Sequence, residues 1–329
     1  MVLLIVIAFF TALVTAAVAG AFLIPALRRM KAGQSIREDG PVWHNSKKGT
    51  PTLGGITFII GIAVAYLSVG MSEIKNGGFG NIFILIFPLV FGAIGFIDDY
   101  NKLRKKQNLG LRGKHKFLLQ LIAAVGFILL MRLTGNLTSS LYFPFINVTI
   151  PIPEPLYYIF AVFVIIGAVN SVNITDGVDG LATGVSIPVG IYFTVVACIW
   201  GSAALGIYAA ALVGGLVAFL FFNFHPAKAF MGDTGSLFLG GAVCAMAFAF
   251  DMPLILVPLG IVYFMETLSD IIQVAYYKLT HGKRVFKMAP LHHHLELCGW
   301  SEYKLFAVFT TVSVVFAVIS YFGVVNRFI

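Results

Sequence analysis

Two neighbouring carboxylates follow an apolar stretch of the sequence, and several cations follow them in turn. The stretch NIFILIFPLVFGAIGF covers residues 81–96, and Asp98 and Asp99 come just after it. Lys102 and three further cations occur before residue 107. Adjacent carboxylates both stay ionised only when cations lie close to them, and Mg²⁺ binds carboxylate and phosphate oxygens together. The pattern indicates a magnesium or phosphate site, and a solvated helix end is the alternative.

A second polar group is NSVNITDGVDGL, residues 170–181. Four polar residues recur in it at every third position: Asn170, Asn173, Asp176 and Asp179. At a helix end this spacing places the side chains on roughly one face. Gly177 and Gly180 free the backbone for a tight turn and for close approach of a ligand. Four polar groups exceed what a helix cap needs, so we interpret the segment as functional.

The third segment is FNFHPAKAFMGDTGSL, residues 222–237, in which Asp233 lies between two glycines. Gly-rich turns before a helix suit phosphate binding, although an aspartate there is also a common N-cap. A helix that starts at Ser236 would be capped by Thr234 or Ser236, which would leave Asp233 free. Phe230 offers a stacking surface, or simply an anchor at the membrane interface.

Three consecutive histidines, His292, His293 and His294, form the fourth group, MAPLHHHLE. On a helix they point about 100° apart, whereas zinc-binding pairs use i, i+4 spacing. They therefore fit zinc poorly, but from a loop they would donate hydrogen bonds to phosphate oxygens. Carboxylates for Mg²⁺ and cations for phosphate are the parts that phosphoryl transfer uses. The sequence contains no Walker A segment and no GxGxxG after a strand.

The elements that must position these groups are membrane helices. Of the 329 residues, 59% are hydrophobic and 11% charged, against about 25% charged in a soluble domain. A transmembrane helix needs roughly 20 apolar residues, and the runs are continuously apolar, which excludes a β-barrel. Ten runs qualify: residues 2–27, 53–71, 81–97, 117–133, 156–172, 181–200, 203–222, 235–250, 253–279 and 303–324. We predict an all-α polytopic protein with ten transmembrane helices in one domain, residues 1–329.

The distribution of positive charge predicts the orientation. No basic residue precedes the first apolar run, so we interpret it as a permanent helix rather than a cleaved signal peptide. With both termini outside, the inner side receives 19 of the 22 Lys and Arg residues, as the positive-inside rule requires. The exceptions are Lys75, Arg132 and Arg327. The polar segments then lie on the cytosolic face, which attracts anionic lipid head groups and polyphosphates.

Two further features lie outside those segments. The outer stretch 134–155 is β-rich and is expected to form a small hairpin or to lie on the membrane surface. Glu266 and Asp270 lie one turn apart inside the run 253–279, where charges usually face protein or water. We expect the inner half of that helix to bend away from lipid or to border the site, or its carboxylates to pair with a basic loop. The three cysteines form no disulfide or zinc motif.

The sequence closely resembles the phospho-N-acetylmuramoyl-pentapeptide transferase family of bacterial membrane enzymes. Five segments carry the resemblance: GTPTLGG (49–55), DDYNK (98–102), NITDGVDGLATG (173–184), FNFHPAKAFMGDTGSL (222–237) and MAPLHHHLELCGW (288–300). The resemblance implies ten transmembrane helices in the bacterial inner membrane and a homodimer that binds no nucleic acid. It also implies Mg²⁺-dependent transfer of phospho-MurNAc-pentapeptide from its UDP-linked form to undecaprenyl phosphate. The products would be lipid I and UMP.

The resemblance also implies roles for individual residues. Asp233 would bind Mg²⁺. The phosphates and the lipid nucleophile would be handled by Asp98, Asp99, Lys102, Lys106 and Lys114. The uridine would be bound by Asp176, Gly177, Asp179 and Phe230, with Lys48 or Lys47 nearby and with Asn173 and Asn223 in the same region. The His segment would contribute His292, His293 and His294 to catalysis.

Our mechanistic hypothesis is a direct displacement in which Asp98 accepts a proton from the lipid phosphate or positions it. A covalent aspartyl intermediate is the alternative. The nearest rival function is transfer of GlcNAc-1-phosphate to a polyprenyl phosphate by a sister enzyme, although the segment MAPLHHHLE favours the muramoyl family. An anion transporter would carry its binding groups near the bilayer midplane. Only Glu266 and Asp270 satisfy that expectation.

Overall fold

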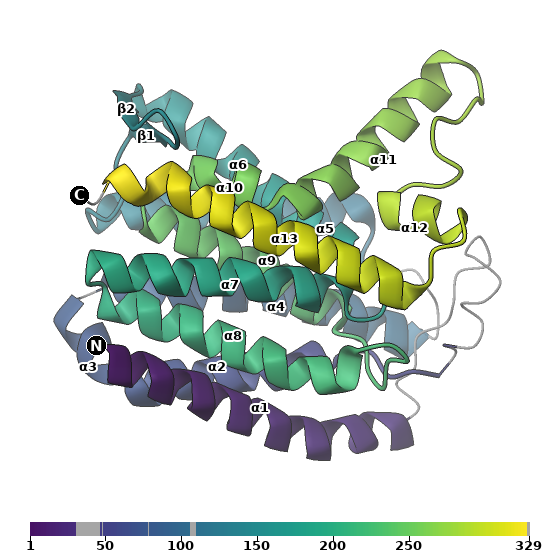
Figure 1. The fold of residues 1–329 in the computed structure, drawn as a ribbon, viewed down its shortest axis with the longest axis horizontal. Coiled ribbons are helices and arrows are strands. Elements are labelled where there is room, and N and C mark those ends of the chain that lie inside the picture. The colour runs from purple at the N-terminus through teal and green to yellow at the C-terminus, as the bar shows by residue number, and fades with distance from the viewer. Residues whose placement is uncertain (31–46, 48, 78, 106–109, 328–329) are drawn as a thin grey trace.

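Long helices make up most of the chain, and the majority lie side by side in Figure 1. The computed structural model describes residues 1–30, 47, 49–77, 79–105 and 110–327. The first helices are α1 (Val2–Arg29), α2 (Gly55–Val69), α3 (Met71–Gly77), α4 (Phe79–Lys105) and α5 (Gly113–Leu133). The strands β1 (Ser140–Phe143) and β2 (Val148–Pro151) precede α6 (Glu154–Thr175), α7 (Leu181–Trp200), α8 (Ala203–Asn223) and α9 (Gly232–Ala249). A 3-10 turn (Pro253–Ile255) leads into α10 (Leu256–Leu259), α11 (Ile261–Leu279), α12 (Leu291–Glu296), α13 (Glu302–Val324) and a final 3-10 turn (Val325–Arg327).

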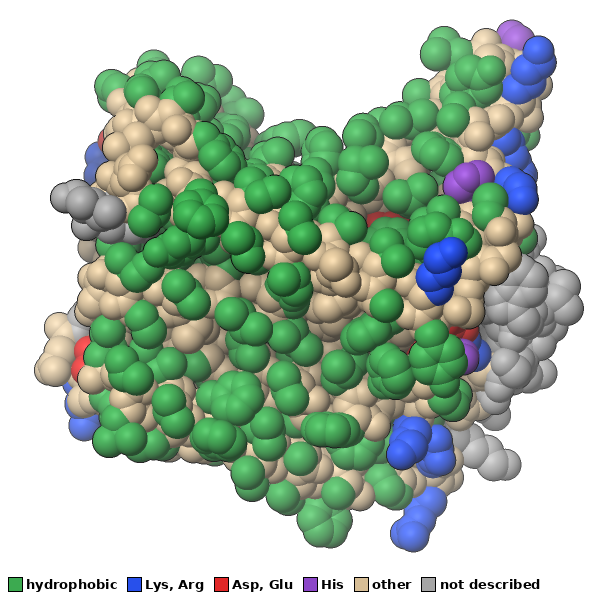
Figure 2. Space-filling view, in the orientation of Figure 1, with side chains coloured by type: hydrophobic (Ala, Val, Ile, Leu, Met, Phe, Trp, Pro, Cys, Tyr) green, Lys and Arg blue, Asp and Glu red, His purple; other side chains and the backbone are tan. Residues whose placement is uncertain are grey.

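The helices have the length and composition of membrane spans. Among the described residues, eight are long and apolar enough to cross a bilayer, and the bent segment from Pro253 to Leu279 is a ninth candidate. The apolar helix α2 is shorter, at 15 residues. Figure 2 shows hydrophobic side chains over the middle of the visible face and Lys and Arg side chains gathered at the end where α12 lies. The all-α, multi-pass class is confirmed, whereas the number ten stays a prediction.

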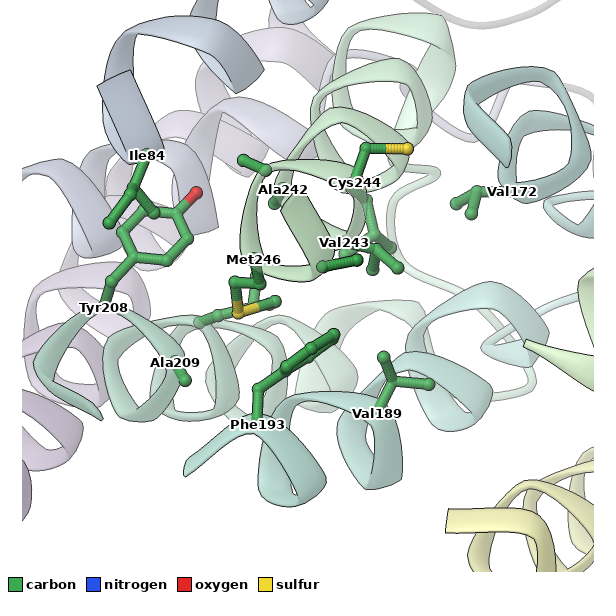
Figure 3. Close-up of a cluster of buried hydrophobic side chains, with 14 of the residues drawn as sticks. Ile84, Val172, Val189, Phe193, Tyr208, Ala209, Ala242, Val243, Cys244 and Met246 are labelled. Atoms are coloured by element: carbon green, nitrogen blue, oxygen red, sulfur yellow. The ribbon is translucent and has the colours of Figure 1, made fainter. Parts of the chain in front are cut away.

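Helix α9 lies inside the bundle and carries one wall of the site. In its most apolar window 83% of the residues are buried, against 22% in α1. Small residues allow other helices to approach its backbone closely: a side chain on Gly240 would meet the backbone of Val169 in α6, and one on Gly241 would meet Pro88 in α4. Figure 3 shows Ala242, Val243, Cys244 and Met246 surrounded by side chains that include Val172, Phe193 and Tyr208. The position of α9 is therefore set by packing along its whole length.

The predicted hairpin is present. The strands β1 and β2 pair antiparallel, with Ser140 opposite Pro151. Figure 1 places both chain ends at the same end of the bundle as this hairpin. Two cations that lie there have local partners: Arg327 lies 3.5 Å from Asp251, and Arg132 lies 2.7 Å from Glu154. These pairs explain how Arg132 and Arg327 are accommodated away from the other basic residues.

Two predicted boundaries are wrong, and both errors concern the site. The run predicted to end at residue 97 continues as α4 to Lys105, so Asp98 and Asp99 lie inside the helix rather than in a loop. Cations in the last turn favour this extension because they complement the negative end of the helix dipole. Helix α9 starts at Gly232, not at Ser236, so Asp233 belongs to its first turn.

Helix α11 leaves the bundle. It is bent by 82° from the segment Pro253–Leu259, and it projects from the bundle in Figure 1. The run 253–279 is therefore bent at Gly260, whereas the expectation that its inner half bends away from lipid stays a prediction. Glu266 is fully buried and pairs with His292 of α12. The carboxylate borders a polar segment instead of facing lipid, as the cost of burying an unpaired charge requires.

Candidate active site

Three carboxylates from two helices converge where the last third of α4 meets the first turn of α9. One oxygen from each of Asp98, Asp99 and Asp233 lies within 4.8 Å of the others. The helices approach closely because Gly95 of α4 has no side chain: a Cβ there would collide with the carbonyl group of Asp233. Gly232 has φ +71°, and a Cβ on it would lie 2.6 Å from the Asp99 carboxylate. Both glycines are therefore required by the geometry of the cluster.

Two lysines neutralise this carboxylate cluster. The Lys102 ammonium lies 2.7 Å from an oxygen of Asp98 and 2.7 Å from an oxygen of Asp233. Lys116 lies 3.0 Å from the same Asp233 oxygen. The other Asp233 oxygen accepts a 2.8 Å hydrogen bond from the Asn173 amide. Three predicted segments therefore meet at Asp233, as the sequence suggested.

The structure separates Asp98 from Asp99. The Asp99 carboxylate accepts hydrogen bonds from the backbone N–H groups of Asp233 and Thr234 and from the Thr234 hydroxyl, at 3.2, 2.9 and 2.7 Å. These N–H groups have no partner within α9, so Asp99 caps that helix from α4. Asp98 accepts from Lys102 and from the Leu111 backbone N–H at 2.6 Å. We infer that Asp99 anchors the start of α9 at Asp233, whereas Asp98 pairs with Lys102.

The carboxylate cluster fits Mg²⁺ by the chemistry of its donors. Hard carboxylate oxygens are the ligands that Mg²⁺ prefers, together with water and substrate phosphate. The Lys102 ammonium bridges Asp98 and Asp233, so positive charge is favourable at that position. Asp98 and Asp233 would hold the ion, while the oxygens of Asp99 are committed to α9. When bound, Mg²⁺ would neutralise charge on phosphate oxygens.

A second cluster surrounds Asp179. Its carboxylate accepts from Lys47 at 2.7 Å and from the Ala227 backbone N–H at 2.9 Å, and His225 Nδ1 lies 2.9 Å from it. Glu302 also binds Lys47, at 2.7 Å. Ligand atoms of three residues lie close enough together to hold a metal ion: Asp179, His225 and Glu302. The Lys47 ammonium, however, already occupies the position of a cation between the carboxylates of Asp179 and Glu302.

The turn at residues 176–180 packs on the His segment. His292 is buried, its Nδ1 lies 2.8 Å from Glu266, and its Nε2 has no hydrogen-bond partner within the described part of the chain. A side chain on Gly177 would collide with this Nε2. Position 177 must therefore be a glycine because His292 approaches its backbone closely. Gly180 forms the turn, with φ +76°.

The remaining predicted residues have separate positions. His293 pairs with Glu296 at 2.7 Å, and His294 Nδ1 accepts from the Lys287 backbone N–H. Neither metal-like group in the described ranges includes these histidines. Buried Asn223 binds Thr183 and the Ala229 carbonyl, and half-buried Phe230 pairs through its backbone with Pro51 and Gly54. Lys114 is exposed, whereas Lys48 and Lys106 lie outside the described residues.

Sequence reasoning missed Lys116 and Glu302. The signal for Lys116 is Gln120, a polar residue one helical turn later in an apolar run, which binds Asn170 and marks the inward face of α5. Glu302 carried no such signal, because an acidic residue in the first turn of a helix is ordinary.

Asp176 has an unfavourable environment for a charged carboxylate. Burial raises the pKa of the Asp176 carboxyl well above its ordinary value. Repulsion from three nearby carboxylates, those of Asp99, Asp179 and Asp233, raises that pKa further. A carboxyl group with a raised pKa in the folded state is harder to ionise there than in the unfolded chain. It therefore lowers the free energy of unfolding as the pH rises above its unfolded pKa of about 3.9, and the loss is complete once the pH exceeds its folded pKa.

Asp176→Asn is therefore expected to stabilise the ligand-free protein, and more so at pH 8 than at pH 5. The expected gain in melting temperature at pH 8 is about 2–4 °C, measured in detergent by thermal denaturation. Asp179→Asn is the matched control in the same turn. Because its carboxylate has three hydrogen-bonding partners, that change is expected to lower the melting temperature. A gain for Asp176→Asn that is equal at both pH values would contradict the explanation.

Known proteins resemble this chain over most of its length. The family model described as glycosyl transferase family 4 matches residues 81–251, which contain both Asp98–Asp99 and Asp233. A Staphylococcus aureus (strain bovine RF122 / ET3-1) protein is 46% identical over 296 residues, which cover 89% of this chain and 91% of the relative. A Clostridium acetobutylicum protein is 44% identical over 308 residues, which cover 93% and 94%. Both are named phospho-N-acetylmuramoyl-pentapeptide-transferase.

The chain belongs to the phospho-N-acetylmuramoyl-pentapeptide-transferase family. It is a multi-pass membrane enzyme, a phosphosugar transferase of peptidoglycan synthesis.

Proposed function

We propose that the protein transfers phospho-MurNAc-pentapeptide from UDP-MurNAc-pentapeptide to undecaprenyl phosphate, releasing UMP and forming lipid I. The observation that carries the proposal is the meeting of Asp98, Asp233 and Lys102 at the ends of two membrane helices. A lipid phosphate reaches that depth from the bilayer, and a nucleotide reaches it from water. The names of the relatives support the choice of donor substrate.

The proposed reaction is a direct displacement. An oxygen of the lipid phosphate forms a bond to the sugar-side phosphorus, and the bond from that phosphorus to the bridging oxygen of the pyrophosphate breaks. The bridging oxygen leaves with UMP. The second pKa of a phosphate monoester is near 6, so most of the acceptor needs no base at neutral pH. Asp98 therefore acts mainly by positioning, and Lys102 and Lys116 offset charge on the phosphates.

The uridine end of the donor belongs, in this proposal, beside Asp176 and Phe230. The Asp176 carboxylate has no hydrogen-bond partner in the part of the chain that the structure describes, so it is available to a ligand. The backbone of Phe230 is fixed by Pro51 and Gly54. His292 lies under the same turn, beneath Gly177. These residues would form a continuous path toward Asp233.

We also propose ten spans with both termini outside and the site facing the cytosol. The eight long helices, the bent pair and α2 supply ten apolar segments. Of the 22 Lys and Arg residues, 19 fall on the inner side in this topology. The homodimer implied by the resemblance stays a prediction.

The deciding experiment measures UMP release by purified protein with undecaprenyl phosphate and Mg²⁺. UDP-MurNAc-pentapeptide and UDP-GlcNAc are compared as donors, and turnover is expected with the first alone. Turnover of UDP-GlcNAc alone would assign the protein to the sister reaction. The same assay in sealed vesicles tests the orientation: inside-out vesicles are expected to use externally added donor without detergent, and right-side-out vesicles are not.

A further inference from the structure

Glu302 is the first residue of α13. An acidic residue in the first turn of a helix usually serves only to interact favourably with the helix dipole. The cap of α13 is supplied by Ser301, which accepts a hydrogen bond from the Lys304 backbone N–H. The Glu302 side chain does more than this. It is buried, and one oxygen accepts from Lys47 at 2.7 Å and from the Asp179 backbone N–H at 3.1 Å.

Glu302 and Asp179 share their partners. Lys47 lies 2.7 Å from an oxygen of each carboxylate. His225 Nδ1 lies 2.9 Å from Asp179 and 3.4 Å from Glu302. Asp179 also accepts from the Ala227 backbone N–H. The network of Lys47, Asp179, His225 and Glu302 thus joins four chain segments that are distant in sequence.

Three of those segments frame the proposed nucleotide end of the site. The turn that holds Asp179 begins at Asp176. The segment of His225 and Ala227 continues to Phe230, and the segment that starts with Lys47 supplies the backbone groups that bind Phe230. Glu302 comes from the fourth segment and contacts each of the other three through a single buried carboxylate. Its loss would leave Lys47 and His225 with Asp179 alone and the Asp179 N–H without a partner, a costly state for a buried donor.

We propose that Glu302 is a positioning residue for the nucleotide part of the donor substrate. It holds the 176–180 turn and the 225–230 segment at the separation that admits the nucleotide, without contacting the reacting phosphates. This role rests on the proposed function. Within that function, Glu302 affects the binding of the donor substrate and not the phosphoryl-transfer step.

The test is Glu302→Gln in the full-length protein, because glutamine keeps the shape and removes the charge. The KM for UDP-MurNAc-pentapeptide is expected to rise about 10- to 100-fold, the range for charged hydrogen bonds. The kcat and the KM for undecaprenyl phosphate are expected to change by less than about 3-fold. The UMP dissociation constant, measured by calorimetry, is expected to rise in parallel with the donor KM. Glu302→Asp, which keeps the charge, is expected to recover part of the donor affinity.

Ser301→Ala is the matched control. It removes the cap of α13, at a cost of about 1 kcal/mol in helix stability, but leaves the network intact, so the donor KM is expected to stay unchanged. An unchanged donor KM in Glu302→Gln, or an equal effect in Ser301→Ala, overturns the proposal. If Glu302→Gln does not accumulate, Lys47→Met is measured instead, and an unchanged donor KM overturns the proposal equally. A wild-type protein that releases no UMP would instead refute the proposed function.

Discussion

Asp233→Asn is expected to slow UMP release by at least about 10³-fold, the upper range for loss of one preorganised electrostatic group. Asparagine preserves the shape of the side chain but removes the charge that both Lys102 and Lys116 contact. It also replaces a proposed Mg²⁺ ligand with a weaker one. Steady-state release of UMP at saturating substrates measures the effect.

Magnesium distinguishes this explanation from a general loss of structure. Chelation with EDTA is expected to abolish wild-type turnover and added Mg²⁺ to restore it, whereas excess Mg²⁺ should not restore Asp233→Asn. Asp251→Asn is the control, because Asp251 follows the opposite end of the same helix and pairs with Arg327. Its turnover number is expected to stay within about 2-fold of wild type. Wild-type turnover that persists in EDTA would refute the magnesium requirement.

Gly95→Ala is expected to reduce turnover by about 10²-fold, although it adds only one methyl group. That group would collide with the Asp233 carbonyl, so α4 and α9 must separate and Asp98 must move away from Asp233. Misplacement of reacting groups by about 1 Å costs roughly this factor. The kcat is measured together with the melting temperature, which is expected to fall by only a few degrees.

Gly126→Ala is the matched control for Gly95→Ala. Gly126 also lies within a membrane helix, α5, but nothing lies within 4 Å of a Cβ added there. Alanine is the better helix former, so this variant is expected to keep full activity and unchanged or slightly higher stability. Equal turnover in the two variants would show that the contact between α4 and α9 does not set the geometry of the site.

Features that depend on local composition were predictable from the sequence. Continuous apolar runs require helices in a bilayer, and the β-rich stretch after α5 forms the expected hairpin. A polar partner for Glu266 was expected from the cost of an unpaired charge in lipid, and His292 provides it. The meeting of Asn173 and Asp233 was expected because both segments were predicted to lie on the same side of the membrane. The helices and the hairpin depend on residues that are close in sequence, whereas the contact between Asn173 and Asp233 was expected only from the predicted alternation of the helices across the membrane.

Features that depend on distant packing were not predictable from one sequence. The capping of α9 by Asp99 joins residues 134 positions apart, and the bond between Lys47 and Glu302 joins residues 255 positions apart. Neither pair has a local spacing that distinguishes it from ordinary surface charge. The continuation of α4 past Asp99 was missed because an apolar window ends where charge begins, whereas a helix continues as long as its charges find partners.

The bridge that Lys102 makes between Asp98 and Asp233 means that the protein carries a built-in counter-ion. A divalent metal ion must compete with the tethered Lys102 ammonium for the carboxylates of Asp98 and Asp233. We therefore expect metal exchange to be reversible and metal affinity to be moderate. The same tether keeps the carboxylates together when no metal or nucleotide is bound. An empty enzyme would therefore begin each turnover with its acidic groups already assembled, and the freed ammonium would be within reach of the incoming phosphates.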